Sequence, residues 1–458
     1  MSSYLFRKKQ LQFLDNQELL RCLTAWDLTL FGIGAVIGAG IFVLTGIAAA
    51  TTAGPAIVLS FVLAGLACAF SALSYAELAS SIGGSGSAYT YAYVGLGEII
   101  AWIIGWDLIL EYALSVSTVA IGWSHYFDSL LISCGWRIPF SFLHSYFSGG
   151  ILNLPALFIV LFVTLLLIIG AKISAKFNAL MVFLKLAVIA LFIGIAAMHI
   201  NPVNWHPFAP FGWDGISAGA ALIFFAYIGF DAVSTTAEEV VNPQRDLPIG
   251  IIASLSICTL LYIIVSALLT GVVPYTSLNV ASPISHALLE LGYRFGAATI
   301  SVGAVAGLTT VILVMYYGLT RVSYAISRDQ LLPPFFSKIH PKTRTPVRII
   351  ATMGIITGLF SALAPMHLLA ELVNIGTLFA FFVVCCGTII LRHTHPEMHR
   401  PFKTPYSPLI PALGMLTCAY LITQLQPETW ARFFIWMGIG LVIYFFYGRY
   451  RSRLHRRK

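Results

Sequence analysis

Two apolar segments of the sequence carry glycines where a continuous helix would not need them. Residues 32–42 contain four glycines within nine positions, and residues 224–231 contain Gly229 followed two positions later by Asp231. Glycine lets a backbone leave the helical conformation and lets a ligand approach the main chain. A helix that breaks inside a membrane bares N–H groups, which attract a carboxylate, and carbonyl oxygens, which attract an ammonium. Paired breaks could therefore hold an α-amino acid.

The glycines have a second interpretation, which is that they only allow helices to pack closely in a membrane. The two segments share a dipeptide, however, as Ile37-Gly38 in the first and Ile228-Gly229 in the second, 191 residues apart. Glycine-interrupted segments at corresponding positions of two halves are typical of transporter binding sites. The matched pair therefore favours two broken helices over tight packing alone.

Lys185 is a basic residue inside a long apolar stretch, at membrane depth. Loss of water disfavours the charged ammonium, so this group could bind and release a proton during a transport cycle. The alternative is that its side chain extends to the inner membrane surface. Lys185 lies eight residues into its expected span, about 12 Å of helix rise, which is too far for that extension to be comfortable.

Carboxylates at membrane depth are functional candidates by default. Asp107 and Glu111 are four residues apart and share a helix face, with Glu111 the deeper of the two. Glu111 could be protonated, pair with a cation, or form a structural hydrogen bond. Asp231 stands where its helix would resume, so helix capping is a serious alternative there. We expect Glu77, Glu238 and Glu239 to cap helices or pair with basic loops.

The elements that must position these residues are transmembrane helices. The 458 residues are 59% hydrophobic and 10% charged, a composition that excludes a soluble enzyme. The unbroken apolar runs favour helices over a membrane β-barrel, whose strands alternate. Stretches of about 20 apolar residues can cross a membrane. The sequence has twelve such stretches, at 25–49, 54–80, 91–122, 151–170, 177–200, 214–237, 248–272, 295–326, 347–363, 368–391, 408–426 and 430–448.

The basic residues predict the orientation of these helices. With the N-terminus in the cytoplasm, 22 of the 26 Lys and Arg residues fall inside, Lys185 falls within the membrane, and Arg137, Arg294 and Arg432 fall outside. This is the positive-inside asymmetry, and it places both termini in the cytoplasm. The basic tail, residues 449–458, would lie near anionic lipid. A nucleic-acid-binding arm is the weaker alternative, and we expect no nucleic-acid partner.

The spans divide into two units of five with two spans left over. Because five is odd, the second unit is expected to be inverted relative to the first. The predicted organisation is a cytoplasmic N-terminal segment, a first repeat, a second repeat, two further spans and a basic cytoplasmic tail, at residues 1–23, 24–200, 214–391, 408–448 and 449–458. The sequence has no P-loop and no HExxH motif, so we predict no catalytic residue, no metal site and no cofactor.

An ordered set of motifs identifies a family resemblance over nearly the whole chain. The motifs are IGAGIF at 37–42, GSGSAY at 84–89, YIGFD at 227–231, AEEVVNP at 237–243 and AISRD at 325–329. This set resembles the amino acid–polyamine–organocation superfamily, specifically the bacterial members of the cationic amino acid transporter family. The resemblance implies an all-α polytopic membrane protein with the leucine-transporter fold, a five-plus-five inverted repeat and two additional helices, in a bacterial inner membrane.

The resemblance also implies roles for individual residues. The substrate carboxylate would meet the first break, the α-ammonium would meet carbonyls of both breaks, Phe225 would cover the substrate as an aromatic gate, and Met315 would line the side-chain pocket. The implied substrate-binding residues are Ile37, Gly38, Ala39, Gly40, Phe225, Ala226, Ile228 and Met315. Lys185 matches the family lysine whose ammonium occupies the sodium position of sodium-coupled relatives, which implies coupling to protons.

Two departures from the family pattern bear on the substrate. Many relatives have a hydroxyl residue where this chain has Ala39, so the backbone alone would contact the carboxylate there. Met315 would narrow the side-chain pocket, which favours small neutral amino acids, although Glu111 could attract a cationic one. We therefore predict a proton-coupled amino acid permease that uses Lys185, with Glu111 as a second candidate. An exchanger of cationic amino acids or polyamines, and a channel or scaffold subunit, are the alternatives.

Overall fold

The computed structural model describes residues 6–9, 21–133, 135–280 and 282–456 of the chain. These residues are almost entirely helical, and among them the only β-type pairing is an isolated bridge between Leu23 and Val240. The rest of the predicted terminal segments, residues 1–5, 10–20 and 457–458, lies outside the described residues.

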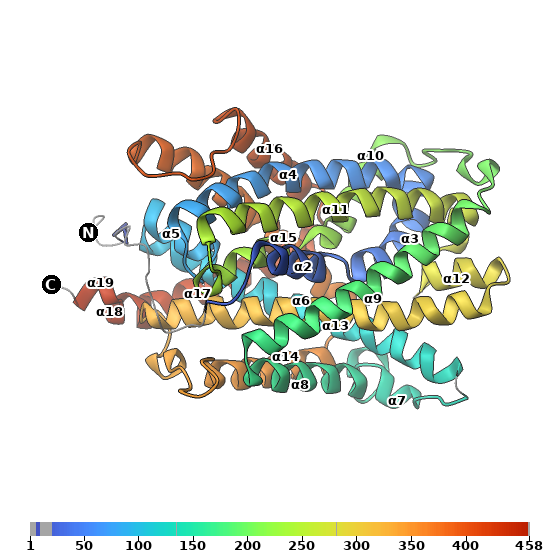
Figure 1. The fold of residues 1–458 in the computed structure, drawn as a ribbon, viewed down its shortest axis with the longest axis horizontal. Helices are drawn as coiled ribbons and strands as arrows, with labels where there is room; N and C mark the ends of the chain where they lie inside the picture. The colour runs from blue at the N-terminus through green and yellow to red at the C-terminus, as the bar shows by residue number, and fades with distance from the viewer. Residues whose placement is uncertain (1–5, 10–20, 134, 281, 457–458) are drawn as a thin grey trace.

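Long helices make up most of the molecule (Figure 1). They are α2 (Ala25–Val36), α4 (Ile57–Ile82), α6 (Glu98–Ser133), α8 (Leu154–Ile169), α9 (Ala171–Ala197), α10 (Gly212–Ile223), α11 (Pro243–Val272), α13 (Arg294–Arg328), α14 (Val347–Leu363), α15 (Met366–Thr394), α16 (Leu409–Thr423) and α17 (Pro427–Ile443). The shorter α-helices are α3 (Thr45–Ala48), α5 (Ala88–Gly95), α7 (Phe140–Leu143), α12 (Pro283–Glu290), α18 (Arg449–Arg451) and α19 (Arg453–Arg456). Short 3-10 and π-helical turns connect several of them.

Eight helical segments of the described chain are long and apolar enough to cross a membrane. The first of them, Ala25–Ile82, takes in two of the predicted stretches. Three shorter apolar helices, α8, α14 and α16, have 15 to 17 residues each. At 1.5 Å per residue they are about 23–26 Å long, somewhat less than the hydrocarbon thickness of a typical bilayer.

Several predicted boundaries are wrong. The third stretch was expected to end at residue 122, but α6 continues to Ser133. The third stretch was expected to begin at residue 91, but α5 occupies that region and α6 begins only at Glu98. Gly97, with φ of +105°, separates the two helices, and a Cβ there would lie 2.8 Å from the backbone of Phe6. Only glycine suits that conformation and that contact. The fifth stretch was expected to begin at residue 177, but α9 already begins at Ala171.

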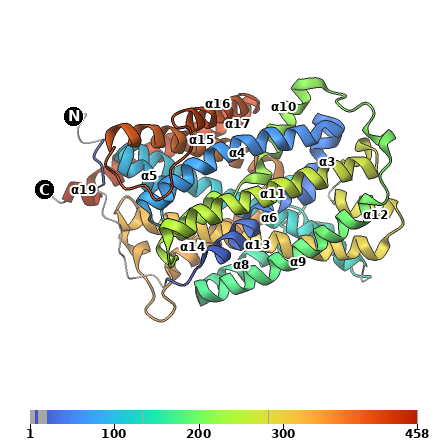
Figure 2. The ribbon, with the colours of Figure 1, turned by 45° about the horizontal axis from the view of Figure 1, so that its top comes forward.

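The long helices run roughly along one axis, and both termini lie at the same end of the molecule (Figures 1 and 2). The connecting helices α7 and α12 lie at the opposite end (Figure 1). We call these ends the terminal end and the far end. In the interior, α13 packs along α6 and α9, while α11 packs along α2 and α4.

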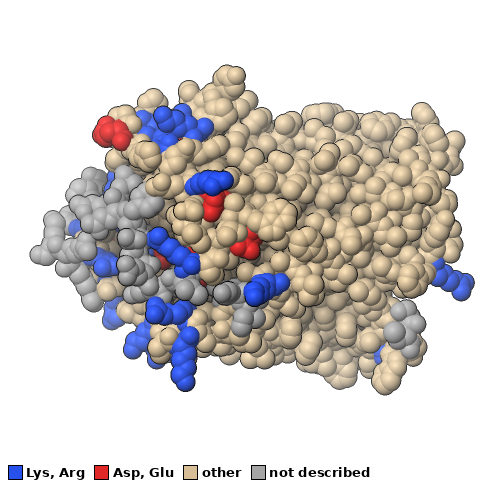
Figure 3. All heavy atoms as spheres, viewed as in Figure 1, with Lys and Arg blue, Asp and Glu red and all other residues tan. Residues whose placement is uncertain are grey.

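Charged side chains gather at the terminal end, and the flank of the molecule is nearly free of them in the view of Figure 3. Large apolar side chains are exposed on the outer helices, among them Phe158, Leu165 and Leu180, each more than 60% exposed. A surface of this kind is unfavourable in water and suits contact with lipid chains. The distribution of polarity therefore matches a helix bundle embedded in a membrane.

Candidate functional site

The first glycine-rich segment contains the predicted interruption. Helix α2 starts at a capping box in which Thr24 and Asp27 satisfy each other's backbone N–H groups. It ends at Val36, and Ile37 is extended, with φ of −76° and ψ of 97°. The chain turns helical again from Gly40, as the π-helical turn η1 (Gly40–Leu44). The break therefore falls at Ile37-Gly38.

The second segment is interrupted at the matching dipeptide. Helix α10 is followed by the 3-10 turn η6 (Phe224–Tyr227), and Ile228 is extended, with ψ of 130°. Gly229 has φ of +126°, which side chains other than glycine rarely tolerate. A Cβ on Gly229 would also lie 2.5 Å from Met315 Cε. The helix resumes as η7 (Asp231–Glu239), so the local glycine chemistry produces both predicted breaks.

The two breaks touch each other in the core. A Cβ on Gly40 would lie 2.2 Å from Ala226 Cα, so glycine permits this crossing. The Tyr262 hydroxyl, from α11, lies 2.6 Å from the Val36 carbonyl oxygen and 2.8 Å from the Ala226 carbonyl oxygen. Its single proton can be donated to only one of the two at a time. Tyr262 thus joins the ends of both broken helices, a contact that its position in an apolar span did not reveal.

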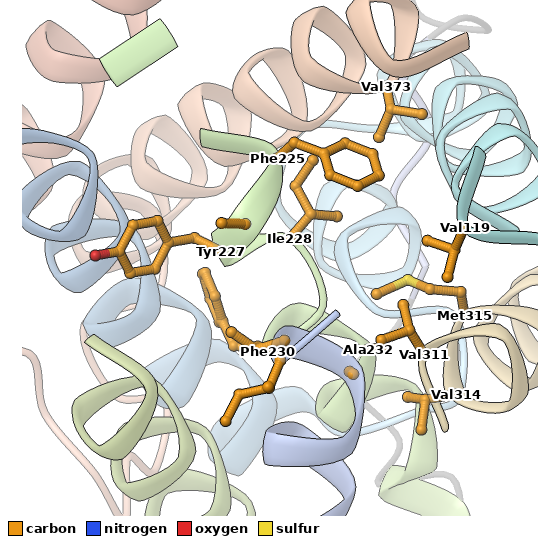
Figure 4. Close-up of a cluster of buried hydrophobic side chains, with 14 of the residues drawn as sticks. Val119, Phe225, Tyr227, Ile228, Phe230, Ala232, Val311, Val314, Met315 and Val373 are labelled. Atoms are coloured by element: carbon orange, nitrogen blue, oxygen red, sulfur yellow. The ribbon is translucent and has the colours of Figure 1, made fainter. Parts of the chain in front are cut away.

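A small buried cavity lies beside the breaks, and most of the predicted binding residues line it: Gly38, Ala39, Gly40, Phe225, Ile228 and Met315. Phe225 and Ile228 face Met315, Val311 and Val119 across this region (Figure 4). The cavity has a volume of about 10 Å³, which holds about one water molecule. An amino acid could enter only if the surrounding helices moved apart.

The remaining predicted binding residues lie next to this cavity without lining it. The Ile37 carbonyl oxygen accepts a hydrogen bond from Lys185 Nζ, and Ala226 packs against Gly40. Five residues that were not predicted also line the cavity: Ala35, Val36, Ser115, Val119 and Val311. Ser115 Oγ is buried and has no hydrogen-bond partner among the described residues. Its position one turn along the helix from Glu111 was the only available signal.

Lys185 is fully buried, and its ammonium is bound to the first break. Nζ donates to the Gly34 carbonyl, the Ile37 carbonyl and Thr310 Oγ1, each at 2.9 Å. These three acceptors use all three ammonium donors. The side chain therefore points inward, and the alternative in which it extends to the membrane surface is wrong. Because α9 starts earlier than predicted, Lys185 also lies deeper in its helix than expected.

Three carboxylates are also fully buried in the core, those of Asp107, Glu111 and Asp231. In the described part of the chain, Asp107 and Glu111 have no hydrogen-bond partner for any of their carboxylate oxygens. Asp231 accepts hydrogen bonds from the Tyr112 hydroxyl and from the Gly229 backbone N–H. It therefore holds the backbone of the second break, but it does not cap the helical turn that follows, whose N-cap is Phe230 without a side-chain hydrogen bond. A buried carboxylate without a partner is costly unless it carries a proton, so Asp107 and Glu111 are candidates for protonated groups.

Buried ion pairs hold helices together at the terminal end of the molecule. Glu239 pairs with Arg321 at 2.6 Å, and both side chains are at most 3% exposed. Glu238 pairs with Arg328 at 2.9 Å and also accepts from the Ser85 backbone N–H. Both arginines lie on α13. The expectation that these two glutamates pair with basic loops is therefore wrong, because their partners lie on a helix.

Further pairs tie more distant segments to this end. Glu77 contacts Arg392 at 2.6 Å, and Lys9 pairs with Asp329 at 2.7 Å. Tyr89 donates to Asp329 at 2.9 Å. Burial, together with the nearby carboxylate, raises the pKa of Tyr89 well above its ordinary value, so this hydroxyl keeps its proton. The terminal end is therefore sealed by a network that spans several helices.

Comparison with known proteins identifies the family. The family model described as amino acid permease matches residues 23–447. The chain is 50% identical to the branched-chain amino acid permease BcaP of Bacillus subtilis over the full length of both proteins. It is 48% identical to the methylthioribose transporter of the same organism, over 99% of this chain and all of the relative. It is 39% identical to the vacuolar cationic amino acid transporter 4 of Arabidopsis thaliana, over 83% of this chain and 64% of the relative.

The matched region contains both breaks, Lys185 and the two pairs that Glu238 and Glu239 form with arginines of α13. The apolar helices, the broken pair of segments and the family match agree with one another. The chain belongs to the amino acid permease family of the amino acid–polyamine–organocation superfamily and is a multi-pass membrane transporter.

Proposed function

We propose that this protein is a proton-coupled amino acid permease of a bacterial inner membrane, with both termini in the cytoplasm. It has twelve transmembrane helices: a first repeat at 24–200, an inverted second repeat at 214–391 and two further helices at 408–448. The cytoplasmic segments 1–23 and 449–458 flank them. Helix breaks at matching Ile-Gly dipeptides support this organisation.

The substrate is an α-amino acid held at the two breaks. Its carboxylate meets the backbone of Gly38, Ala39 and Gly40, and its ammonium meets carbonyls at the breaks. Its side chain faces Val119, Val311 and Met315, which are apolar. An apolar wall favours neutral aliphatic side chains, because a charged group would lose its water there without a partner. We therefore favour small neutral amino acids, and the name of the branched-chain permease relative agrees with an aliphatic substrate.

Methylthioribose is the competing substrate, because a close relative bears that name. Its methylthio group would suit the same apolar wall, but the sugar has no ammonium and no carboxylate for the bared backbone groups. A competition panel separates the two. Excess unlabelled valine or alanine should block uptake of the labelled amino acid, and methylthioribose should not.

Coupling follows from the position of Lys185. Its ammonium bonds two carbonyls of the first break and is buried without a carboxylate contact in the described chain. Loss of the proton would remove one donor and relieve the cost of a buried charge, and the break would then be held less firmly. Protonation of Lys185 and the geometry of the binding site are thus linked. The hydrogen bonds from Lys185 to the first break are the observation on which the proposed proton coupling rests. Glu111 is a second candidate for binding the proton.

The proposal is tested with purified protein in liposomes and a panel of radiolabelled amino acids. An imposed inward pH gradient should drive accumulation of neutral aliphatic amino acids into liposomes that contain no substrate. An exchanger of cationic amino acids or polyamines would instead require substrate inside and would show no response to the gradient. Conductance far above carrier turnover would indicate a channel, and no transport at all would indicate a scaffold.

Met315 should set the size of the accepted side chain. Met315→Ala removes about three heavy atoms from the pocket wall, and a buried CH₂ group contributes about 0.8 kcal/mol. We therefore expect the preference for leucine over alanine, measured as the ratio of kcat/KM values for uptake, to rise about tenfold. Val314→Ala is the matched control, because Val314 is buried on the same helix but does not line the cavity. An unchanged ratio in Met315→Ala would contradict this role.

The Arg321–Glu239 pair should hold the terminal end closed. Arg321→Met leaves Glu239 buried without its partner, a loss that costs about 3–5 kcal/mol for buried pairs. We expect a lower Tm and slower uptake in this variant. The double variant Arg321→Met/Glu239→Gln should recover much of the Tm, because it removes the unpaired charge, while closure stays weakened. Equal Tm values in the wild type and the single variant would show that the pair does not stabilise this state.

A further inference from the structure

A second, larger cavity lies at the far end of the molecule, and we call it the vestibule. Its volume is about 390 Å³. Leu44 lines it just beyond the first break, Leu222 just before the second, and Ile121 on α6. The small cavity is lined by the adjoining residues of the same three segments. The two cavities therefore lie between the same three segments.

The vestibule contains an amide oxygen that nothing in the described chain satisfies. Asn374 on α15 lines the vestibule and is 2% exposed. Its Nδ2 donates to the Ala221 carbonyl at 3.1 Å, but its Oδ1 has no partner among the described residues. Leaving a buried acceptor unsatisfied costs about 1–3 kcal/mol. A ligand that donates a hydrogen bond in the vestibule would remove this cost.

A carboxylate lies next to that amide. Glu371 is three residues before Asn374 on the same helix, so the two share a face, and it also lines the vestibule. Its Oε2 accepts from the Thr429 hydroxyl at 2.7 Å, while Oε1 accepts no hydrogen bond from the residues that the structure describes. Arg432 Nη1 forms a long, partly exposed ion pair with Oε2 at 3.7 Å, a distance greater than that of a hydrogen bond. Glu371 therefore keeps one oxygen available for a cationic group.

The remaining walls suit the rest of an amino acid. Leu44, Ile121 and Leu143 provide apolar surface, and the imidazoles of His125 and His144 lie on the same cavity. Imidazole N–H groups can donate to a carboxylate. Small-molecule sites have volumes of about 300–1,000 Å³ and a few polar groups on a mostly apolar wall. The vestibule fits both the size and this pattern.

We propose that the vestibule is a second binding site for an α-amino acid, in which Glu371 and Asn374 accept hydrogen bonds from its ammonium. This inference rests on the proposed function, since the ligand is the transported amino acid. The vestibule holds the molecule while the small cavity, with room for one water, is closed. Movement of Phe225 and the broken helices then transfers the amino acid inward.

Equilibrium binding of tritiated L-valine to purified protein in lipid nanodiscs tests the vestibule site. The wild type should bind two molecules per chain. Gly38→Val should retain one, in the vestibule, while Glu371→Gln and Asn374→Ala should each lose the vestibule molecule and retain the other. Loss of a hydrogen bond to a charged group costs enough to weaken affinity about tenfold, so the affinity of that site should fall by at least this factor.

Glu428→Gln is the matched control. Glu428 is exposed at the start of α17, next to Thr429, and does not line the vestibule. This variant removes the same charge from the same region and should keep both sites. A fall in affinity equal to that of Glu371→Gln would mean that general surface charge is responsible and would overturn the proposal.

The other outcomes separate the two proposals. A single site that Glu371→Gln and Asn374→Ala leave unchanged overturns the vestibule site and leaves the permease proposal standing. A single site lost in both of those variants supports the vestibule and contradicts the site at the breaks. Binding of neither tritiated L-valine nor tritiated L-alanine to the wild type overturns the proposed substrate class, and the vestibule proposal with it.

Discussion

Lys185→Ala should reduce pH-driven uptake in proteoliposomes to the level of liposomes without protein. The variant removes the ammonium that bonds the Gly34 and Ile37 carbonyls, and with it the group proposed to carry the proton. Substrate binding should weaken without disappearing, because the backbone of the break is still present. The measurement is accumulation of labelled valine or alanine under an imposed inward proton gradient, together with exchange at equal pH on both sides.

Lys176→Ala is the matched control for this loss. Lys176 lies on the same helix, α9, and its side chain is exposed, so the variant removes a lysine of the same type without touching the break. It should transport as the wild type does. Exchange that persists in Lys185→Ala would show that the variant is folded. Full accumulation by Lys185→Ala under the pH gradient would contradict the role of Lys185 in coupling.

Gly38→Val should abolish amino acid binding at the break. A Cβ on Gly38 would lie 2.5 Å from Val311 Cγ2, and the two methyl groups of valine would occupy the small cavity. Overpacking of this kind costs about 1–3 kcal/mol, so a lower Tm is expected as well. The vestibule is proposed to bind an amino acid separately from the break. Binding at the break is therefore measured by transport, and by the one binding site that should remain in Glu371→Gln.

Two further variants show whether the loss arises from the site itself. Gly194→Val is the matched control, because Gly194 is exposed on α9 and a Cβ there would meet nothing within 4 Å. It should bind and transport normally. Gly38→Ala adds only the Cβ atom that clashes with Val311. Combining it with Val311→Ala removes the methyl group that this Cβ contacts. The double variant should therefore recover transport. If Gly38→Val bound the amino acid at the break with unaltered affinity, Gly38 would not be part of the binding site.

The amino-acid sequence by itself determined the class of protein and the places where its helices break. Few charges and long apolar runs require a membrane, because water cannot solvate so much apolar surface. The breaks at Gly38 and Gly229 were predictable because glycine acts locally, through the conformations that its own backbone allows. The importance of Lys185 was predictable for a similar reason, since a lone charge in an apolar run needs a partner wherever the chain folds.

Only the tertiary structure decided what these residues contact. Tyr262, whose hydroxyl lies within hydrogen-bond distance of a carbonyl at each break, is an ordinary tyrosine of an apolar span until α11 packs beside α2. Asp231 could have served several roles, and the Tyr112 hydroxyl and the Gly229 N–H hold it at the second break. Lys185 could have extended to the surface, but α9 packs against α2 and α13, and its acceptors lie on α2, on α13 and in the break that follows α2. Most of these partners are more than a hundred residues apart in sequence. The pattern of apolar residues does not say which buried helix faces meet. Packing of the helices selects those pairs, because an unsatisfied polar group in a membrane interior costs several kcal/mol.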